Sequence, residues 1–482
     1  MQEETTAGAG PGGPAPPAEA GTRGSVTRRR FLQLAGAAAA GLALQACAPV
    51  GEKPTSTSSQ PVQLVYQDWR TRWFPPMAAT MLAEFHATHP DIRVFYVPDP
   101  ENERFAEKML ADMQAGSAPD VFQGNGVFFP TWAQKGYTLD LRPFVKADLD
   151  QATIDDWDPA QYRSFFAPDG LQFGVPKYHG ALALYYNKDL FDALGVSPPS
   201  ESWNQDDYLS AMSRVTRTPA DAAAGRWGSM LSIDWDRLQV HANAWGGNFV
   251  DSKHPTRSAM ADPPSLRAME WLRARMWDDR VMATVTDVQN LSLATAFADG
   301  RLAMVEDGSW SLKDILTNAK FRVGLAPMPA GPARRVTLAT TDGFGIYAGT
   351  RHPEAAWELV KFLIGKEYGR AMARANLLQP ARLSLVDEWS GYVRDEFPTA
   401  ARDLDIGVFA DGQRRGYSVT AEVFPAQMDE VTRLCSDAWE LLFTLGKTRT
   451  NSLTEVATAI DRLQDQAGPT KSGWTEPRGA AG

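Results

Sequence analysis

The chain of 482 residues is poor in the side chains that build disulfide frameworks and metal sites, with two cysteines and six histidines. The histidines show no metal-ligand spacing such as His-Glu-x-x-His, so we expect no metal. Cys435 falls on an apolar helical stripe with Met428, Val431 and Leu442, which indicates a buried small residue rather than a nucleophile. The composition therefore argues against a disulfide scaffold and against a metalloenzyme.

Basic residues are also scarce relative to acidic ones. Lysine and arginine number 48 and aspartate and glutamate 58, which gives a net charge of −10. An acidic surface repels the phosphate backbone, so we expect no nucleic-acid partner. Beyond the N-terminal region, no apolar run is long enough to cross a membrane.

Common catalytic motifs are missing as well. No Gly-x-Ser-x-Gly occurs, and the glycines of residues 343–349 have the wrong spacing for a dinucleotide fold. Residues 445–448 (LGKT) mimic the end of a phosphate loop, but Leu441 stands where glycine is required. We therefore expect no cofactor and no enzyme. An exported glycan-hydrolysing enzyme is the alternative, because a glycosidase needs only two suitably spaced carboxylates.

The N-terminus carries three arginines at 28–30, a short apolar stretch at 31–46 and then Cys47. A membrane span needs roughly 20 apolar residues, so this stretch is typical of an export signal rather than of an anchor helix. Residues 27–33 resemble a twin-arginine signal and residues 44–47 a bacterial lipobox. We predict a twin-arginine lipoprotein signal peptide over 1–46, lipidation of Cys47, and attachment to the outer face of the cytoplasmic membrane. A Ser, Thr and Pro-rich flexible tether follows over 47–61.

Downstream of the tether the periodicity alternates between strand and helix. Residues 62–66, 92–97 and 121–122 read as strands, and the apolar stripes between them read as helices. The same alternation recurs with a strand over 181–186 and a helix over 188–194. This order predicts an α/β fold with a mostly parallel sheet covered by helices.

Four segments together resemble one family. They are AGSAPDVFQGNG (115–126), GVPKYHGALALYYNKDLFDALGVSPPSESW (174–203), AFADGRLAMVEDGSW (296–310) and HPEAAWELVKFLIGKE (352–367). In this order and spacing they resemble the extracellular solute-binding proteins of ABC importers, specifically the carbohydrate-binding, maltose-binding-protein-like group.

The resemblance implies a two-lobed periplasmic-binding-protein-like fold, with a hinge and a ligand cleft between the lobes. By its pattern the chain crosses between the lobes near 178–180, 307–309 and 367–371. Closure then requires a ligand that contacts both lobes, because a ligand shifts a conformational equilibrium only by its differential affinity. The implied lobes are 62–178 plus 310–368, and 179–309 plus 369–482.

The resemblance also implies a function, namely capture of a sugar or related polyol and its delivery to the permease subunits of an ABC importer. We expect a monomer tethered to the membrane through its lipid anchor. Two further possibilities stay open. The solute could be phosphorylated or not a sugar, with Arg70 and Arg72 near the first strand end, or the protein could feed a sensor.

Candidate ligand-binding residues lie at strand ends and crossings, where open α/β sheets bind ligands. Rings cover the C–H faces of a sugar, while carboxylates, amides and guanidinium groups bond its hydroxyls. Trp310 is the foremost stacking candidate, whereas core packing competes as the role of Trp235 and Trp245. The candidates are Asp68, Trp69, Asn125, Tyr178, His179, Trp235, Trp245, Trp310, Asp342 and Arg382.

Overall fold

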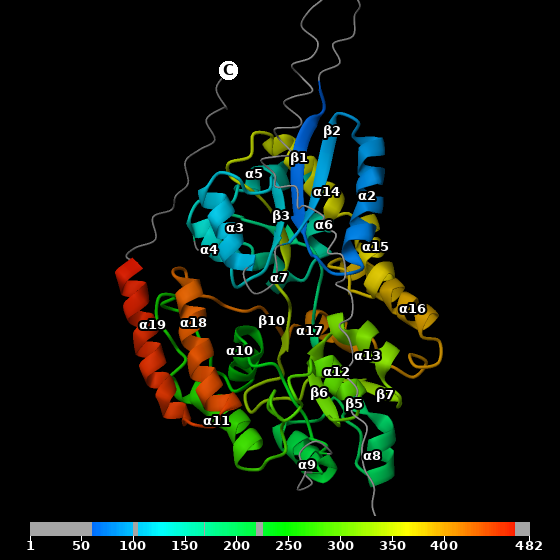
Figure 1. Ribbon diagram of the computed structural model, residues 1–482, viewed down its shortest axis with the longest axis vertical. Coiled ribbons are helices and arrows are strands. Elements are labelled where there is room, and N and C mark those ends of the chain that lie inside the picture. Colours follow the sequence, from blue (N-terminus) through cyan, green and yellow to red (C-terminus); the bar gives the residue numbers. More distant parts are fainter. Residues whose placement is uncertain (1–59, 100–104, 168, 218–224, 468–482) are drawn as a thin grey trace, which may run out of the picture. The chain divides into compact units, whose positions relative to one another are not determined.

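The computed structural model describes residues 60–99, 105–167, 169–217 and 225–467 (Figure 1). The predicted signal peptide and Cys47 lie outside the described residues, as does all but the end of the predicted tether. Within these ranges, no helix has both the length and the apolar character needed to cross a bilayer.

The first sheet has the strand order β2-β1-β3-β9-β4. The first three strands of the chain are those expected from the alternation, and β1 pairs in parallel with both β2 and β3. β9 runs antiparallel to β3 and to β4, so the sheet is mixed rather than mostly parallel. The strand bounds are β1 Val62–Asp68, β2 Ile92–Pro98, β3 Val121–Gly124, β4 Val175–Pro176 and β9 Gly343–Ile346.

Helices cover this sheet because their apolar stripes face it. α2 packs on β2, α15 packs on α2, and α14 packs on β1, β3 and β9 (Figure 1). Met109 and Met113 of α3 are buried in a satellite cluster with Phe122 and Trp132. These helices are α2 Phe74–Thr88, α3 Phe105–Gln114, α4 Phe129–Gln134, α5 Arg142–Asp148, α6 Gln151–Asp155, α7 Pro159–Arg163, α14 Pro353–Leu363 and α15 Lys366–Asn376.

The second sheet is antiparallel, with the order β6-β5-β7. Its central strand β5 is buried on both faces, because alternate side chains enter different clusters. Leu184 and Tyr186 join one cluster, while Ala183 and Tyr185 join the other. The strands are β5 Leu182–Asn187, β6 Met304–Gly308 and β7 Val323–Ala326.

Among the helices around the second sheet, α8 begins and ends as local sequence signals predict. The Asn187 side chain accepts a bond from the Leu190 amide at 3.0 Å and caps α8, and Gly195 ends it at φ +60°. Cys435 is buried in α18, as expected from its stripe. These helices are α8 Lys188–Leu194, α9 Gln205–Val215, α10 Trp235–Ala244, α11 Pro263–Trp277, α12 Leu293–Ala298, α13 Leu312–Asn318, α16 Val386–Glu396, α17 Val408–Arg415, α18 Met428–Trp439 and α19 Leu453–Ala467.

Three chain segments run side by side between the two sheets, over 177–181, 339–342 and 379–380. Backbone hydrogen bonds tie the first segment to the other two, and the amide of His179 donates to the carbonyl of Gln379 at 3.2 Å. A short strand, β8 Thr337–Leu338, leads into the middle segment and pairs in parallel with β10 Ser418–Val419. The first segment contains the predicted crossing at 178–180.

The middle connection differs from the expected one at 307–309. After β6 the chain passes through a 3₁₀ turn and α13, and it returns as β7 antiparallel to β5. Residues 310–326 therefore belong with the second sheet, although the predicted division grouped them with the first. The chain regains the first sheet only at β9, because β6 and β7 both need β5 as their hydrogen-bonding partner.

Candidate functional site

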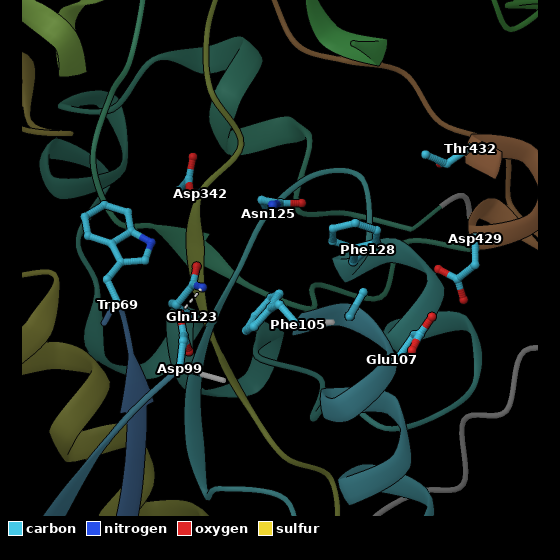
Figure 2. Close-up of a pocket in the computed structure, with 11 residues that line it drawn as sticks. Trp69, Asp99, Phe105, Glu107, Gln123, Asn125, Phe128, Asp342, Asp429 and Thr432 are labelled. Carbon is cyan, nitrogen blue, oxygen red and sulfur yellow. Dashed lines mark hydrogen bonds between the residues drawn. The ribbon is translucent and has the colours of Figure 1, made fainter. Parts of the chain in front are cut away.

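Three parallel strands of the first sheet end at one edge, and a cavity of about 380 Å³ opens there (Figure 2). β1 is followed by Trp69, β2 by Asp99 and β3 by Asn125, so all three strand ends contribute a side chain. The far wall comes from α18 of the second sheet's helices. The lining residues are Trp69, Asp99, Phe105, Ala106, Glu107, Gln123, Asn125, Phe128, Asp342, Asp429 and Thr432.

The lining combines flat rings with hydrogen-bonding groups. Trp69, Phe105 and Phe128 supply the rings, and Gln123 and Asn125 supply amides (Figure 2). Such a surface can cover C–H faces while bonding hydroxyl groups. The close approach at the β3 end requires glycine, since a Cβ at residue 126 would come within 1.8 Å of the hydroxyl oxygen of residue 341.

Asp68 lies behind this lining rather than in it. Its side chain has no exposed surface and accepts hydrogen bonds from Lys177 and Tyr66, and from the Trp69 amide at 2.7 Å. The ammonium of Lys177 lies 3.2 Å from the centroid of the Trp69 ring. Asp68 was predicted to bond ligand hydroxyls, but its donors are internal, so it orients Lys177 and Trp69 instead.

Two carboxyl groups that line the cavity have raised pKa values. Burial, with the nearby charge of Asp68, raises the pKa of Asp99 to about 6. Burial likewise raises the pKa of Asp342 to about 6, although Lys177 opposes that shift. Asp99 also accepts bonds from Gln123 at 2.8 Å and from Gln67 at 3.2 Å.

A second polar cluster lies at the start of α10. The guanidinium of Arg237 pairs with Asp234 at 3.0 Å and lies 5.0 Å from the centroid of the Trp310 ring. Burial, with the charges of Asp234 and Asp342, raises the pKa of Asp236 to about 7, while Arg237 opposes the shift. Since Asp342 belongs to the cavity lining, the two clusters are electrostatically coupled. Neither Asp236 nor Arg237 was among the site residues predicted from the sequence.

Trp310 lies beside the second cluster and packs against the hydrophobic cores of both sheets. It is half-buried, and its ring covers the backbone of two glycines. A Cβ at Gly180 would come within 2.8 Å of the ring, and one at Gly308 within 2.2 Å. Trp310 thus lies at the hinge, with Arg237 against its ring.

The predicted hinge residues are buried. Tyr178 is 7% exposed and contacts Trp69 edge-on with ring centroids 5.3 Å apart. His179 has no exposed surface, and its Nε2 lies 3.3 Å from Asp158. A ligand role was predicted for His179, but its burial leaves it a hinge contact.

Three other predicted ligand-binding residues contact the interior of the protein rather than the cleft. The Arg382 guanidinium lies over a Trp157 ring at 4.4 Å and donates to the carbonyls of residues 153 and 364. Trp235 is 3% exposed and donates its indole N–H to the Glu422 carbonyl at 2.9 Å. Trp245 is 9% exposed and packs on Trp271. Because each of these side chains is buried and has internal partners, it offers little surface to a ligand.

Other lining residues were missed, for different reasons. Asp99 comes two residues after the predicted strand 92–97, so the strand-end rule that selected Trp69 could have found it. Asp429 and Thr432 carry no local signal, because only the fold brings α18 to this edge. Among the described residues, no group of three or more His, Cys, Asp or Glu side chains could hold a metal ion.

The chain resembles known proteins in sequence. A family model described as bacterial extracellular solute-binding protein matches residues 69–370. A binding protein of Brucella abortus is 25% identical over 291 residues, covering 59% of this chain and 67% of the relative. The galactooligosaccharide-binding protein of Bacillus subtilis is 22% identical over 360 residues, covering 73% and 80%.

Solved structures share the fold. An ABC substrate-binding protein of Listeria monocytogenes, solved in complex with cycloalternan, superposes with a TM-score of 0.71 at 20% identity. The match covers 85% of this chain and 99% of that protein. The two-lobed architecture expected from the sequence is therefore confirmed.

Proposed function

The chain belongs to the bacterial extracellular solute-binding protein family, and on this premise we propose that it captures a carbohydrate between its lobes for an ABC importer. The observation that carries the proposal is the cavity at the strand ends. It joins rings and hydrogen-bonding side chains of the first lobe to Asp429 and Thr432 of α18. A ligand held there contacts both lobes, which is what closure requires. The similarity to a galactooligosaccharide-binding protein supports a sugar.

Within this proposal, five of the sequence-derived candidates form the ligand surface or its hinge. Trp69, Asn125 and Asp342 line the cavity. At the hinge, Tyr178 contacts the lining residue Trp69, and Trp310 packs against Arg237. Trp69 would stack on a sugar face, and the carboxylate and amide would accept or donate to hydroxyls.

The strand pairing supports a revised division of the lobes. The first lobe comprises residues 62–178 and β9 with the helices that follow it, and the second comprises residues 180–339 and α16 to α19. The three hinge segments are 177–181, 339–342 and 379–380. Export through a twin-arginine signal, lipidation of Cys47, a monomeric state and docking to permease subunits complete the proposal.

Two observations argue against the alternative functions, which are binding of a phosphorylated solute and glycan hydrolysis. A phosphorylated solute needs clustered Lys or Arg, and none of the described lining residues is basic. A hydrolase is disfavoured because the relatives are binding proteins. If incubation with glycans released new reducing ends, the enzyme reading would replace this one.

A thermal-shift screen over mono-, di- and oligosaccharides tests the proposal. A ligand that binds only the native state at 100 times its Kd stabilises it by about 2.7 kcal/mol, so the melting temperature rises. The Asp342→Asn variant should show a reduced shift. If no carbohydrate in the panel changed the melting temperature of the wild-type protein, sugar capture would be wrong although the fold would stand.

A further inference from the structure

Negative charge exceeds positive charge on the first-lobe side of the site. The buried ammonium of Lys177 is bonded to Asp68, and it also interacts with Asp99 and Asp342. Burial lowers the pKa of Lys177, and these three carboxylates oppose that shift. Two cations, Lys177 and Arg70, which donates to the Asp99 carbonyl at 2.8 Å, therefore lie beside three carboxylates, two of which line the cavity.

On the second-lobe side of the site, carboxylates likewise outnumber cations. Burial would lower the pKa of Arg237, but Asp234, Asp236 and Asp307 reverse the effect and raise it. Burial raises the pKa of Asp307, as it does that of Asp236. Here one cation serves three carboxylates, and the charge of Asp342 reaches across to Asp236.

Polar atoms in this region also lack partners. In the part of the chain that the structure describes, Oδ1 of Asp236 and Nε of Arg237 have no exposed surface and no hydrogen-bond partner. Thr432 Oγ1, on a residue of the cavity wall, is in the same condition. A polar ligand in the cavity would supply a partner for Thr432 Oγ1.

The opposite wall adds two more carboxylates, one from each lobe. Glu107 of α3 and Asp429 of α18 both line the cavity, and Figure 2 shows their carboxylates facing each other. Burial raises the pKa of Asp429, Lys135 lowers it, and Glu107 raises it. The lobes thus present like charges to one another at this point, which a positive group between them would relieve.

We propose that the preferred ligand is a hydroxyl-rich molecule carrying a protonated amine, such as an amino sugar, rather than a neutral sugar. This rests on the proposed function and names the ligand class for the same cavity. An ammonium group donates to carboxylates with charge-assisted bonds, and it is attracted to the faces of Phe105, Phe128 and Trp69. A neutral sugar leaves the excess charge uncompensated when the site is desolvated.

Matched pairs of sugars test the charge directly. We would measure Kd by calorimetry at pH 7.0 for glucosamine against glucose, and for the fully deacetylated glucosamine disaccharide against cellobiose. Members of a pair differ only in amine or hydroxyl at C2 of each ring. We expect at least tenfold tighter binding of the amine member in one pair. The preference should shrink at higher salt and as the pH falls below about 6, where Asp99 and Asp342 take up protons.

Variants test whether the cavity carboxylates cause the preference for the amine-bearing sugar. Asp342→Asn should reduce the amine preference by about tenfold, whereas Asp395→Asn, the same change on an exposed turn of α16, should leave it intact. Equal or tighter binding of the neutral members would overturn the amine proposal while sugar capture stood. An unchanged preference in Asp342→Asn would overturn it too. If neither kind of sugar bound to folded protein, the proposed function itself would fail.

Discussion

Replacing Lys177 by Met should destabilise the first lobe strongly, because it removes one partner of a fully buried ion pair. Both side chains have 0% relative exposure, and Asp68 would keep only neutral donors, from Tyr66 and the Trp69 amide. Removing one partner of a buried pair typically costs about 3–5 kcal/mol. The ammonium also lies 3.2 Å from the Trp69 ring centroid, and a desolvated contact of that type is worth about 2 kcal/mol.

Urea unfolding at pH 7.5 measures this loss. A matched control is Lys361→Met, whose ammonium pairs with Asp148 at 3.0 Å while its side chain is 29% exposed. An exposed pair contributes about 0–1 kcal/mol. The double variant Asp68→Asn/Lys177→Met should recover part of the loss, because it leaves no unpaired buried charge. If Lys177→Met cost no more than Lys361→Met, Asp68 and Lys177 would be solvated groups facing the ligand, and the structural role assigned to them would be wrong.

Three further outcomes are expected. Trp310→Ala should weaken ligand binding by about 2–4 kcal/mol, the scale of a binding hot spot, and calorimetry giving an unaltered Kd would remove Trp310 from the site. Ligand-free protein should gain stability as the pH falls from 8 to 5, because the pKa of Asp342 is raised to about 6. A raised carboxyl pKa favours the folded state below that pKa, and about one pH unit below 6 the gain is about 1.4 kcal/mol. Identical melting-temperature profiles for wild type and Asp342→Asn would contradict that assignment. Cys47→Ala should release the protein from the membrane fraction, and retention there would refute lipid anchoring.

Local rules predicted much of the fold, because they depend on nearby residues. Period-two alternation located the first strand, short apolar runs located the next two, and Asn187 with Gly195 marked both ends of α8. Local rules could not predict that the chain returns to the second sheet as β7. That return depends on pairing with β5, which lies more than 130 positions earlier, and a short buried strand has no sequence signal for its partner.

The cavity residues, too, could be predicted where a local rule applies and were misplaced where a distant contact decides. The strand-end rule found Trp69 and Asn125, and it applies equally to Asp99. It placed Asp68 in the cleft because nothing local reveals that Lys177, 109 positions away, binds that carboxylate internally. Arg382 was misplaced for a similar reason, since its stacking on Trp157 is a tertiary contact.

Hydrogen exchange of backbone amides, with and without the tightest ligand of the thermal-shift screen, tests two-lobed capture most directly. Ligand between the lobes should slow exchange on both sides of the cavity, in the segment from Gln123 to Phe128 and at the start of α18 around Asp429. Slower exchange in one lobe alone, with saturating ligand bound, would contradict the account.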